Sequence, residues 1–330
     1  MKNDPGSGKV LHERYQIKSI VGQGGYGSIY LAEDLRLEGR LCAVKQVRYD
    51  AALPDELLKE SRDQFLREAT VLARLDHPNL PKVSDFFSIG KDDFLVMDYV
   101  PGDDLRTTLA KAEGSGKFLK EEDVLNWAVQ IGDALSYLHH QDPPILHRDI
   151  KPSNLKLTPS GVVKLVDFGL VKLLAPDEVT ITIMQGQGTA IYTPLEQYGG
   201  DSNHTDARAD VYAFGCTLYH LLTNTPPMNV RDRFLRPESL PSPRSINPAI
   251  TPRVDDAVIW AMALHPDDRP KDVTTFVKVL TGESTGNLRR IGGGYSQSLR
   301  AQVGKAETQL TLVTIGLVFL SLLFTLLHNL

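Results

Sequence analysis

The chain has 330 residues, of which 42% are hydrophobic and 23% charged, a balance typical of globular domains with a hydrophobic core. Its formal net charge of −5 gives no general attraction for nucleic acid, so no nucleic-acid partner is expected. Two distant cysteines, Cys42 and Cys216, exclude a disulfide scaffold and a cysteine zinc site, and they fit a reducing compartment. The first ten residues lack an apolar segment, so no cleavable signal peptide is expected.

The first hundred residues are predicted to form strands and one helix. The glycine cluster GQGGYG lies between YQIKSIV and SIYLAEDL, which alternate apolar and polar residues. This pattern predicts a strand, a tight turn and a second strand. RLCAVKQVRY and FLVMDYV are predicted to be further strands, and residues 63–75 have the apolar spacing of an amphipathic helix.

The rest of the chain up to about residue 281 is predicted to be mainly helical. EEDVLNWAVQIGDALSYLHH has acidic residues in its first turn and histidines in its last, an arrangement that the helix dipole favours. ADVYAFGCTLYHLLT and VDDAVIWAMALHP are predicted to be further helices. A β-rich part followed by a helical part indicates an α+β protein with two lobes and a ligand cleft between them.

The C-terminal end has two further segments. Residues 282–309 are rich in Gly, Ser and Thr and are predicted to be a flexible juxtamembrane linker. Residues 310–327 contain no charge, and about 18 apolar residues are enough to cross a bilayer, so we predict a transmembrane helix over 310–328. A buried core helix is the alternative. The basic residues Arg289, Arg290, Arg300 and Lys305 precede the span and predict a single-pass protein of the cell membrane whose preceding part is cytoplasmic.

The glycine cluster matches the pattern GxGxxG, which occurs in more than one kind of nucleotide site. A dinucleotide-binding fold requires a helix directly after the glycines, whereas a strand is predicted here. A Walker P-loop is also excluded, because GSGKV near the N-terminus lacks the spacing and the Ser or Thr. The remaining interpretation is a glycine-rich hairpin whose backbone N–H groups lie over phosphates.

Eight motifs occur in a fixed order: GQGGYGSI, AVK, REA, HRDIKPSN, DFG, PLE, DVYAFG and PDDRP. Together they resemble the signature of the eukaryotic-like (Hanks-type) Ser/Thr protein kinases, and in detail its bacterial branch. The resemblance extends from about residue 15 to 280 and implies the bilobal protein-kinase fold. It gives the following limits: N-terminal tail 1–14, kinase domain 15–281, N-lobe 15–97, hinge 98–103 and C-lobe 104–281.

The resemblance implies which residues transfer the phosphoryl group of ATP to Ser or Thr hydroxyls of protein substrates. Phosphoryl transfer requires neutralised phosphate charge and an aligned hydroxyl. Lys45 resembles the lysine that contacts the α- and β-phosphates, and Glu68 is expected to pair with it. Asp149 is expected to orient the substrate hydroxyl, and Lys151 to neutralise the transferring phosphoryl group.

The resemblance also implies which residues bind the metal ion and which contact ATP. Asn154 and Asp167 are expected to bind Mg²⁺, with Mn²⁺ as an alternative ion, because hard cations prefer oxygen ligands. The residues expected to contact ATP are Val21, Gly22, Gln23, Gly24, Gly25, Tyr26, Gly27, Ile29, Ala43, Lys45, the gatekeeper Met97, the hinge residues Asp98 and Val100, Asp104 near the ribose, and Lys156. Lys156 stands where the family usually has an apolar residue under the adenine. Its methylenes either cover the ring while the ammonium reaches water, or it perturbs the pocket.

Control residues are implied by the same resemblance. Arg148 is expected to pair with a phosphate on Thr180 or Thr182, and autophosphorylation there is expected to order the activation loop. Thr189 matches the threonine that contacts the catalytic Asp and Lys. Three residues have expected structural roles: Glu196, Asp210 and Arg269, the first and last as an ion pair. Pro194 comes one residue earlier than in the family, which leaves the substrate-binding loop undefined.

Two other functions compete with a membrane-tethered Ser/Thr kinase. A nucleotide-binding pseudokinase scaffold is disfavoured because Lys45, Asp149, Asn154 and Asp167 are all present. A small-molecule kinase of the same fold is disfavoured by the long activation loop and the segment GTAIY. The expected partners are protein substrates and the lipid bilayer, and a homodimer is left open.

Overall fold

The structure is a computed structural model that describes residues 6–24, 27–49, 54–167, 190–198, 205–236 and 239–284. The chain divides into two units, Met1–Gly286 and Asn287–Leu330, and all described residues belong to the first. The predicted phosphoacceptors Thr180 and Thr182, the threonine Thr189 and the predicted span 310–328 lie outside the described residues.

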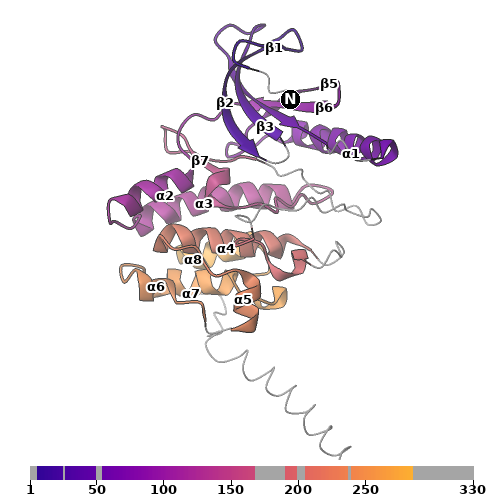
Figure 1. The fold of residues 1–330 in the computed structure, drawn as a ribbon. Helices are drawn as coiled ribbons and strands as arrows, with labels where there is room; N and C mark the ends of the chain where they lie inside the picture. The colour runs from indigo at the N-terminus through magenta and orange to yellow at the C-terminus, as the bar shows by residue number, and fades with distance from the viewer. Residues whose placement is uncertain are drawn as a thin grey trace, which may run out of the picture. The chain divides into compact units, whose positions relative to one another are not determined.

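The N-lobe is an antiparallel sheet with one long helix beside it (Figure 1). The sheet has the order β1-β2-β3-β4-β6-β5, and α1 packs against β5. Its strands are β1 (Val10–Leu11), β2 (Tyr15–Gly24), β3 (Gly27–Asp34), β4 (Leu41–Val47), β5 (Val83–Ile89) and β6 (Asp92–Asp98), and the helix is α1 (Asp55–Arg74).

Alternation along the strands separates the two faces of this sheet. Tyr30, Ala32, Cys42, Val44 and Val96 are at most 1% exposed and belong to one hydrophobic cluster. Because neighbouring residues of a strand point to opposite faces, the residues between them point away from that cluster. The N-lobe therefore has one face for its core and one for other contacts.

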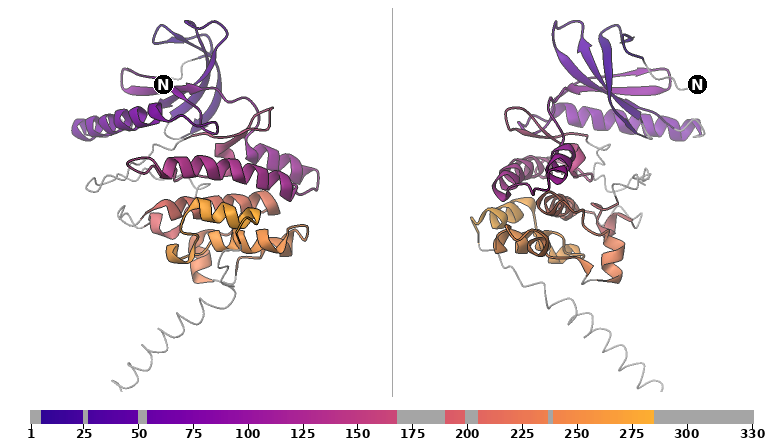
Figure 2. Two further views of the ribbon diagram at one scale, coloured as in Figure 1. Left: turned by 180° about the vertical axis from the view of Figure 1, so that it is seen from behind. Right: turned by 60° about the vertical axis from the view of Figure 1, so that its left-hand side comes forward.

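The C-lobe consists of helices and one small hairpin. The hairpin pairs β7 (Leu155–Leu157) with β8 (Val163–Leu165), next to the 3₁₀ turn η1 (Pro152–Asn154). The helices are α2 (Leu105–Gly114), α3 (Glu121–His139), α4 (Ala207–Thr223), α5 (Val230–Leu235), α6 (Pro243–Ile246), α7 (Pro252–Ala261) and α8 (Val273–Thr281). Figure 2 shows α3, α4, α7 and α8 stacked against one another, and the same helices are in contact.

Helix α4 is the centre of the C-lobe. It is apolar on almost all sides, as expected of a helix surrounded by other elements. Gly215 permits its closest approach to α7, since a Cβ atom there would lie 2.8 Å from the Ala261 Cβ. Residues of α4 are therefore fixed by packing on several sides.

The predicted two-lobed α+β fold is confirmed. The helix predicted over 63–75 is longer than expected, because α1 begins at Asp55. Asp55 and Glu56 favour a start there through the helix dipole, although they precede the strongest apolar spacing. Among the helices of the described ranges, none is long and apolar enough to cross a membrane.

Candidate active site

The motif HRDIKPSN forms the loop over residues 147–154, called the catalytic loop below after the kinase resemblance. It is attached to α4 through Asp210. This carboxylate is 0% exposed and accepts hydrogen bonds from the His147 and Arg148 N–H groups, both at 2.8 Å. The His139 Nε2, in the last turn of α3, lies 2.8 Å from it. Burial alone would raise the pKa of Asp210, but the hydrogen bond from His139 and the nearby histidines hold it below its usual range. Asp210 therefore anchors the loop as an anion.

The loop brings Asp149, Lys151 and Asn154 together. Lys151 Nζ donates to Asp149 Oδ2 at 2.8 Å, and Asn154 Nδ2 donates to the same oxygen at 2.9 Å. The other carboxylate oxygen, Oδ1, is buried and has no hydrogen-bond partner among the described residues. A buried acceptor without a donor is costly and is typical of a functional site. Asp149 Oδ1 is therefore placed to accept a hydrogen bond from a hydroxyl.

A backbone hydrogen bond brings the chain next to Asp167 close to Asn154. The Val166 N–H donates to the Asn154 carbonyl at 2.8 Å, so Asp167 follows directly after this contact. The Lys45 ammonium donates to Asp167 across the two lobes, and mainly this charge holds the pKa of Asp167 below its usual range. Asp167 also has φ +57°, a left-handed conformation that is uncommon for residues other than glycine.

These two residues fit a magnesium ion. The Asn154 amide nitrogen is used by Asp149, so the ligand atom would be its carbonyl oxygen Oδ1, which accepts a long hydrogen bond from Ser153 Oγ at 3.4 Å. Asp167 supplies an ionised carboxylate. No group of three or more His, Cys, Asp or Glu side chains suited to a metal occurs in the described part of the chain. Phosphate and water oxygens would complete the coordination, as is usual for Mg²⁺ in phosphoryl-transfer sites.

Glu68 lies on α1 and is 3% exposed. Its Oε1 accepts from Gln64 Nε2 at 3.1 Å. The contact that the structure describes for the Lys45 ammonium is with Asp167, and the pairing of Lys45 with Glu68 stays a prediction.

The expected nucleotide face of the N-lobe lies opposite its core. Ile29 pairs with Lys45 across β3 and β4, and Ala43 pairs with Met97 across β4 and β6. Cross-strand partners share a face, so the four side chains line one surface. Gly27 is required next to it, because a Cβ atom there would lie 1.8 Å from the Gln46 carbonyl oxygen. The remaining residues of the hairpin tip, Gly25 and Tyr26, lie outside the described ranges.

The hinge has a backbone donor suited to a purine. The Asp98 N–H donates to the Lys82 carbonyl at 3.0 Å. The Val100 N–H has no hydrogen-bond partner among the described residues. The Val100 N–H is therefore available as a hinge donor for a base edge.

Asp104 and Lys156 have local roles that the sequence did not indicate. The Asp104 carboxylate accepts from the Thr107 N–H at 2.6 Å and so caps the N-terminus of α2. Lys156 is half-buried in β7, between Asp104 on one side and Lys164 on the other. Like charges opposite each other in a hairpin are unfavourable, so Lys156 opposite Lys164 lowers the stability of the hairpin. Its place under the adenine stays a prediction.

Arg148 is a half-buried guanidinium with φ +61°. Burial lowers its pKa, and the charges of Asp210 and Glu68 oppose that effect. Its Nε is buried and has no hydrogen-bond partner in the described part of the chain. Such a group is stabilised by an additional anion, which a phosphate would provide.

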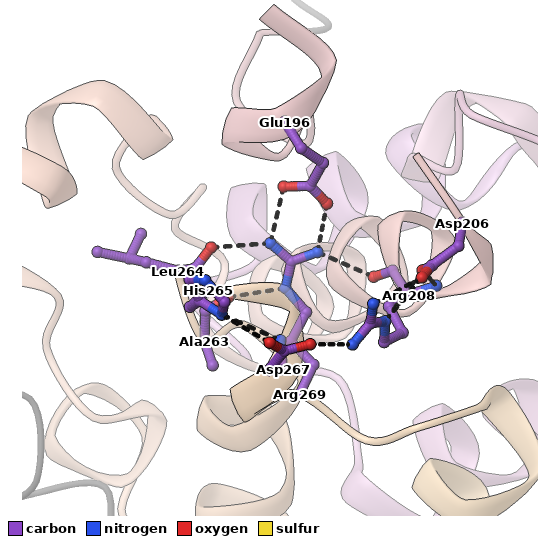
Figure 3. Close-up of polar contacts among 8 residues, drawn as sticks. All are labelled: Glu196, Asp206, Arg208, Ala263, Leu264, His265, Asp267 and Arg269. Atoms are coloured by element: carbon purple, nitrogen blue, oxygen red, sulfur yellow. Dashed lines mark hydrogen bonds and ion pairs between the residues drawn. The ribbon is translucent and has the colours of Figure 1, made fainter. Parts of the chain in front are cut away.

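The expected ion pair between Glu196 and Arg269 is present (Figure 3). Arg269 donates to both Glu196 oxygens, at 2.6 and 3.0 Å, from a fully buried side chain. It also donates to the carbonyls of Ala263, Leu264 and Arg208 at 2.8 to 3.0 Å. The segment around Glu196 is thereby fixed to the base of α4.

Three residues form side-chain contacts that were not predicted from the sequence. His139 was interpreted only as a dipole-favoured residue, although it contacts Asp210. Tyr192 and His220 form a further contact, with the phenol oxygen 2.7 Å from the His220 Nδ1. The partners in each contact are far apart in the sequence, so only a motif alignment could have indicated them.

The comparisons with known proteins agree with this geometry. The model of the protein kinase domain family matches residues 15–264. A probable serine/threonine-protein kinase of Streptomyces coelicolor is 37% identical over 78% of this chain and 38% of its own length. Serine/threonine-protein kinase PknB of Mycobacterium leprae is 34% identical over 78% of this chain and 41% of its own length.

Solved structures agree as well. A mutant PknI kinase domain of Mycobacterium tuberculosis matches 84% of this chain and 98% of its own, with TM-score 0.66 and 27% identity. The chain belongs to the protein kinase family, among relatives that are bacterial Ser/Thr kinases. It spans less than half of the length of these curated relatives.

Replacing Arg269 by Ala should reduce the free energy of unfolding by about 3 kcal/mol, because Glu196 would remain half-buried without its partner. Arg208→Ala is the matched control. It removes more exposed ion pairs to Asp206 and Asp267 and should cost less than about 1 kcal/mol. Chemical denaturation of both variants measures the difference, and equal losses would show that the Glu196 pair does not anchor the segment.

Proposed function

We propose that this chain is an active Ser/Thr protein kinase that transfers the γ-phosphoryl group of ATP to protein hydroxyls. The observation that carries the proposal is the arrangement of Asp149, whose Oδ2 is held by Lys151 and Asn154 while its buried Oδ1 has no partner within the described ranges. A carboxylate fixed on one side and open on the other is suited to orient a substrate hydroxyl.

The residues divide the work of phosphoryl transfer as follows. Asp149 holds the hydroxyl in line with the phosphoryl group and accepts its proton. Lys151, 2.8 Å from Asp149, places positive charge beside the reacting atoms, and Lys45 places another beside Asp167. Asn154 and Asp167 would hold Mg²⁺, which when bound would supply the charge neutralisation that the phosphates require.

A pseudokinase scaffold is not favoured. A scaffold has no need for an acceptor oxygen that is buried without a donor, because leaving it unsatisfied lowers stability. In this chain the catalytic loop keeps the unsatisfied oxygen, and Arg148 and Asp167 also keep left-handed conformations, which lower stability further. These features support an enzyme.

We further propose autophosphorylation on Thr180 or Thr182. Arg148 supports it, since the buried Nε and the lowered pKa of its guanidinium both favour an added anion. A phosphate carries up to two negative charges and would order the segment against Arg148.

The test is transfer from labelled ATP and Mg²⁺ to a generic protein substrate, with Asp149→Ala as the control. The wild-type chain should label the substrate and itself, and the variant should lose at least about 1,000-fold in rate because it lacks the group that orients the hydroxyl. Mass spectrometry should then find phosphate on Thr180 or Thr182. Nucleotide binding without transfer would favour the scaffold, and active protein with neither threonine modified would exclude autophosphorylation at these sites.

Attachment to the cell membrane is a separate proposal, with the kinase domain on the cytoplasmic side. It rests on the uncharged run 310–327 and on the basic residues before it. The linker over 282–309 would give the domain a reach of about 30 Å from its anchor, by the scaling of flexible chains.

Cell fractionation tests this attachment. The full chain should remain with membranes after alkaline extraction, because an apolar helix stays in the bilayer without electrostatic help. A chain that ends at Gly286 should appear in the soluble fraction. Full-length protein in the soluble fraction would show that residues 310–328 do not span a membrane.

A further inference from the structure

One face of the N-lobe sheet carries Lys45 together with residues near the turn between β5 and β6. Lys45 pairs with Leu95 across β4 and β6, and Leu95 pairs with Phe86 across β5 and β6. Asp93 precedes Leu95 by two residues in β6. Cross-strand partners lie on the same face of a sheet, and so do residues two apart along a strand. Phe86 and Asp93 therefore lie on the same face as Lys45.

Helix α1 packs on this face through an aromatic contact and an ion pair. The ring centres of Phe65 and Phe86 are 5.4 Å apart. Arg62 donates to both oxygens of Asp93, from Nε and Nη2, each at 3.3 Å. Its Nη2 also donates to the Gly90 carbonyl at 3.1 Å. Phe65 is the first buried residue of α1, so Arg62 connects the part of the helix before the apolar packing to the sheet.

Asp93 is a buried carboxylate that receives hydrogen bonds from several elements. It is 1% exposed, and burying a carboxylate is costly unless donors surround it. Besides Arg62, the Tyr49 hydroxyl donates to it at 2.7 Å and the Ser88 hydroxyl at 2.5 Å. Burial and the hydrogen bond to Asp93 raise the pKa of Tyr49, so the phenol keeps its proton near neutral pH. Among these three donors, Arg62 supplies the positive charge.

The residue spacing in α1 links this ion pair to Glu68. Arg62, Phe65 and Glu68 follow one another at intervals of three, so their side chains lie on one face of the helix. Arg62 and Phe65 hold that helix face against the sheet face that carries Lys45. Glu68 is buried on the same side and is 3% exposed. A shift or rotation of α1 that breaks the Arg62 contact would therefore also move Glu68.

We propose that the ion pair between Arg62 and Asp93 fixes α1 on the sheet and thereby positions Glu68 for phosphoryl transfer. This inference rests on the proposed protein-kinase function and on the expected pairing of Glu68 with Lys45. Neither member of the ion pair belongs to the eight motifs of the kinase resemblance. Both are positioning residues, because they act through α1 and do not touch the reacting atoms.

The experiment measures kcat of the full chain for phosphorylation of a generic protein at saturating ATP, in Arg62→Met and Arg62→Lys. Both variants are assayed below their unfolding midpoints, which thermal denaturation determines. Methionine removes the charge and the hydrogen bonds to Asp93. A partly exposed ion pair contributes about 1 kcal/mol, so kcat of Arg62→Met should fall at least about twofold and up to about fivefold. Arg62→Lys keeps the charge and should lose less.

Combination with Glu68→Gln separates positioning from a general loss of stability. Glu68→Gln alone should lower kcat, and adding Arg62→Met should cause no further loss, because the two changes remove the same contribution. Single-turnover measurements keep slow transfer measurable in these variants. An Arg62→Met effect of equal size in both backgrounds would overturn the proposal, since Arg62 would then not act through Glu68. Wild-type kcat in Glu68→Gln would overturn it as well.

Lys59→Met is the matched control. It removes a positive charge from an exposed position of the same helix and should leave kcat unchanged. Wild-type kcat in Arg62→Met, or equal losses in Lys59→Met and Arg62→Met, would overturn the proposal while the kinase function stands. So would equal losses in Arg62→Lys and Arg62→Met. A wild-type chain that phosphorylates neither a generic protein nor itself would overturn the kinase function, and the proposal with it.

Discussion

Asp210 carries the constraint on which the site depends. Its carboxylate is removed from water, a state that costs several kcal/mol unless hydrogen bonds satisfy it. Two backbone N–H groups of the catalytic loop and the ring of His139 satisfy it here. The cost of burying the charge is therefore offset only while the loop keeps its place. Asp210 belongs to a helix that is packed on nearly all sides, so the loop bound to it is held in place by the C-lobe core.

The same helix fixes the segment around Glu196. Arg269 donates to the Arg208 carbonyl in the first turns of α4 and lies 4.8 Å from the centre of the Tyr212 ring. It also pairs with Glu196, while His220 near the other end of α4 contacts Tyr192. The catalytic loop and the segment around Glu196 thus share one support. Small shifts between them would misalign a hydroxyl and its acceptor, to which transfer rates are highly sensitive.

The sequence predicted the fold and the local parts of the site well, because these depend on short motifs. Alternation in β3 and β4 places Ile29, Ala43 and Lys45 on one face, and the spacing within HRDIKPSN brings Lys151 and Asn154 to Asp149. The contacts of His139 and His220 were not predicted, since each depends on how two helices or a helix and a loop pack. Pattern alone does not encode such packing.

Asp104 shows a different limit of sequence analysis. The motif favoured a ribose contact, which stays a prediction, and it did not indicate that one oxygen of this carboxylate caps the N-terminus of α2. Both roles suit the same residue type, and an Asp before a helix is a common cap. Lys45 also has more than one partner of matching charge: the structure describes its contact with Asp167, and its predicted pairing with Glu68 stays a prediction.

The most direct test of this account is the turnover of Asp210→Asn. The amide keeps the size of the side chain but turns one acceptor into a donor, which would face an N–H group of the loop. If Asp210 positions the catalytic loop, kcat should fall at least about tenfold while KM for ATP changes less than about twofold. A folded variant with the kcat of the wild-type chain would contradict the account.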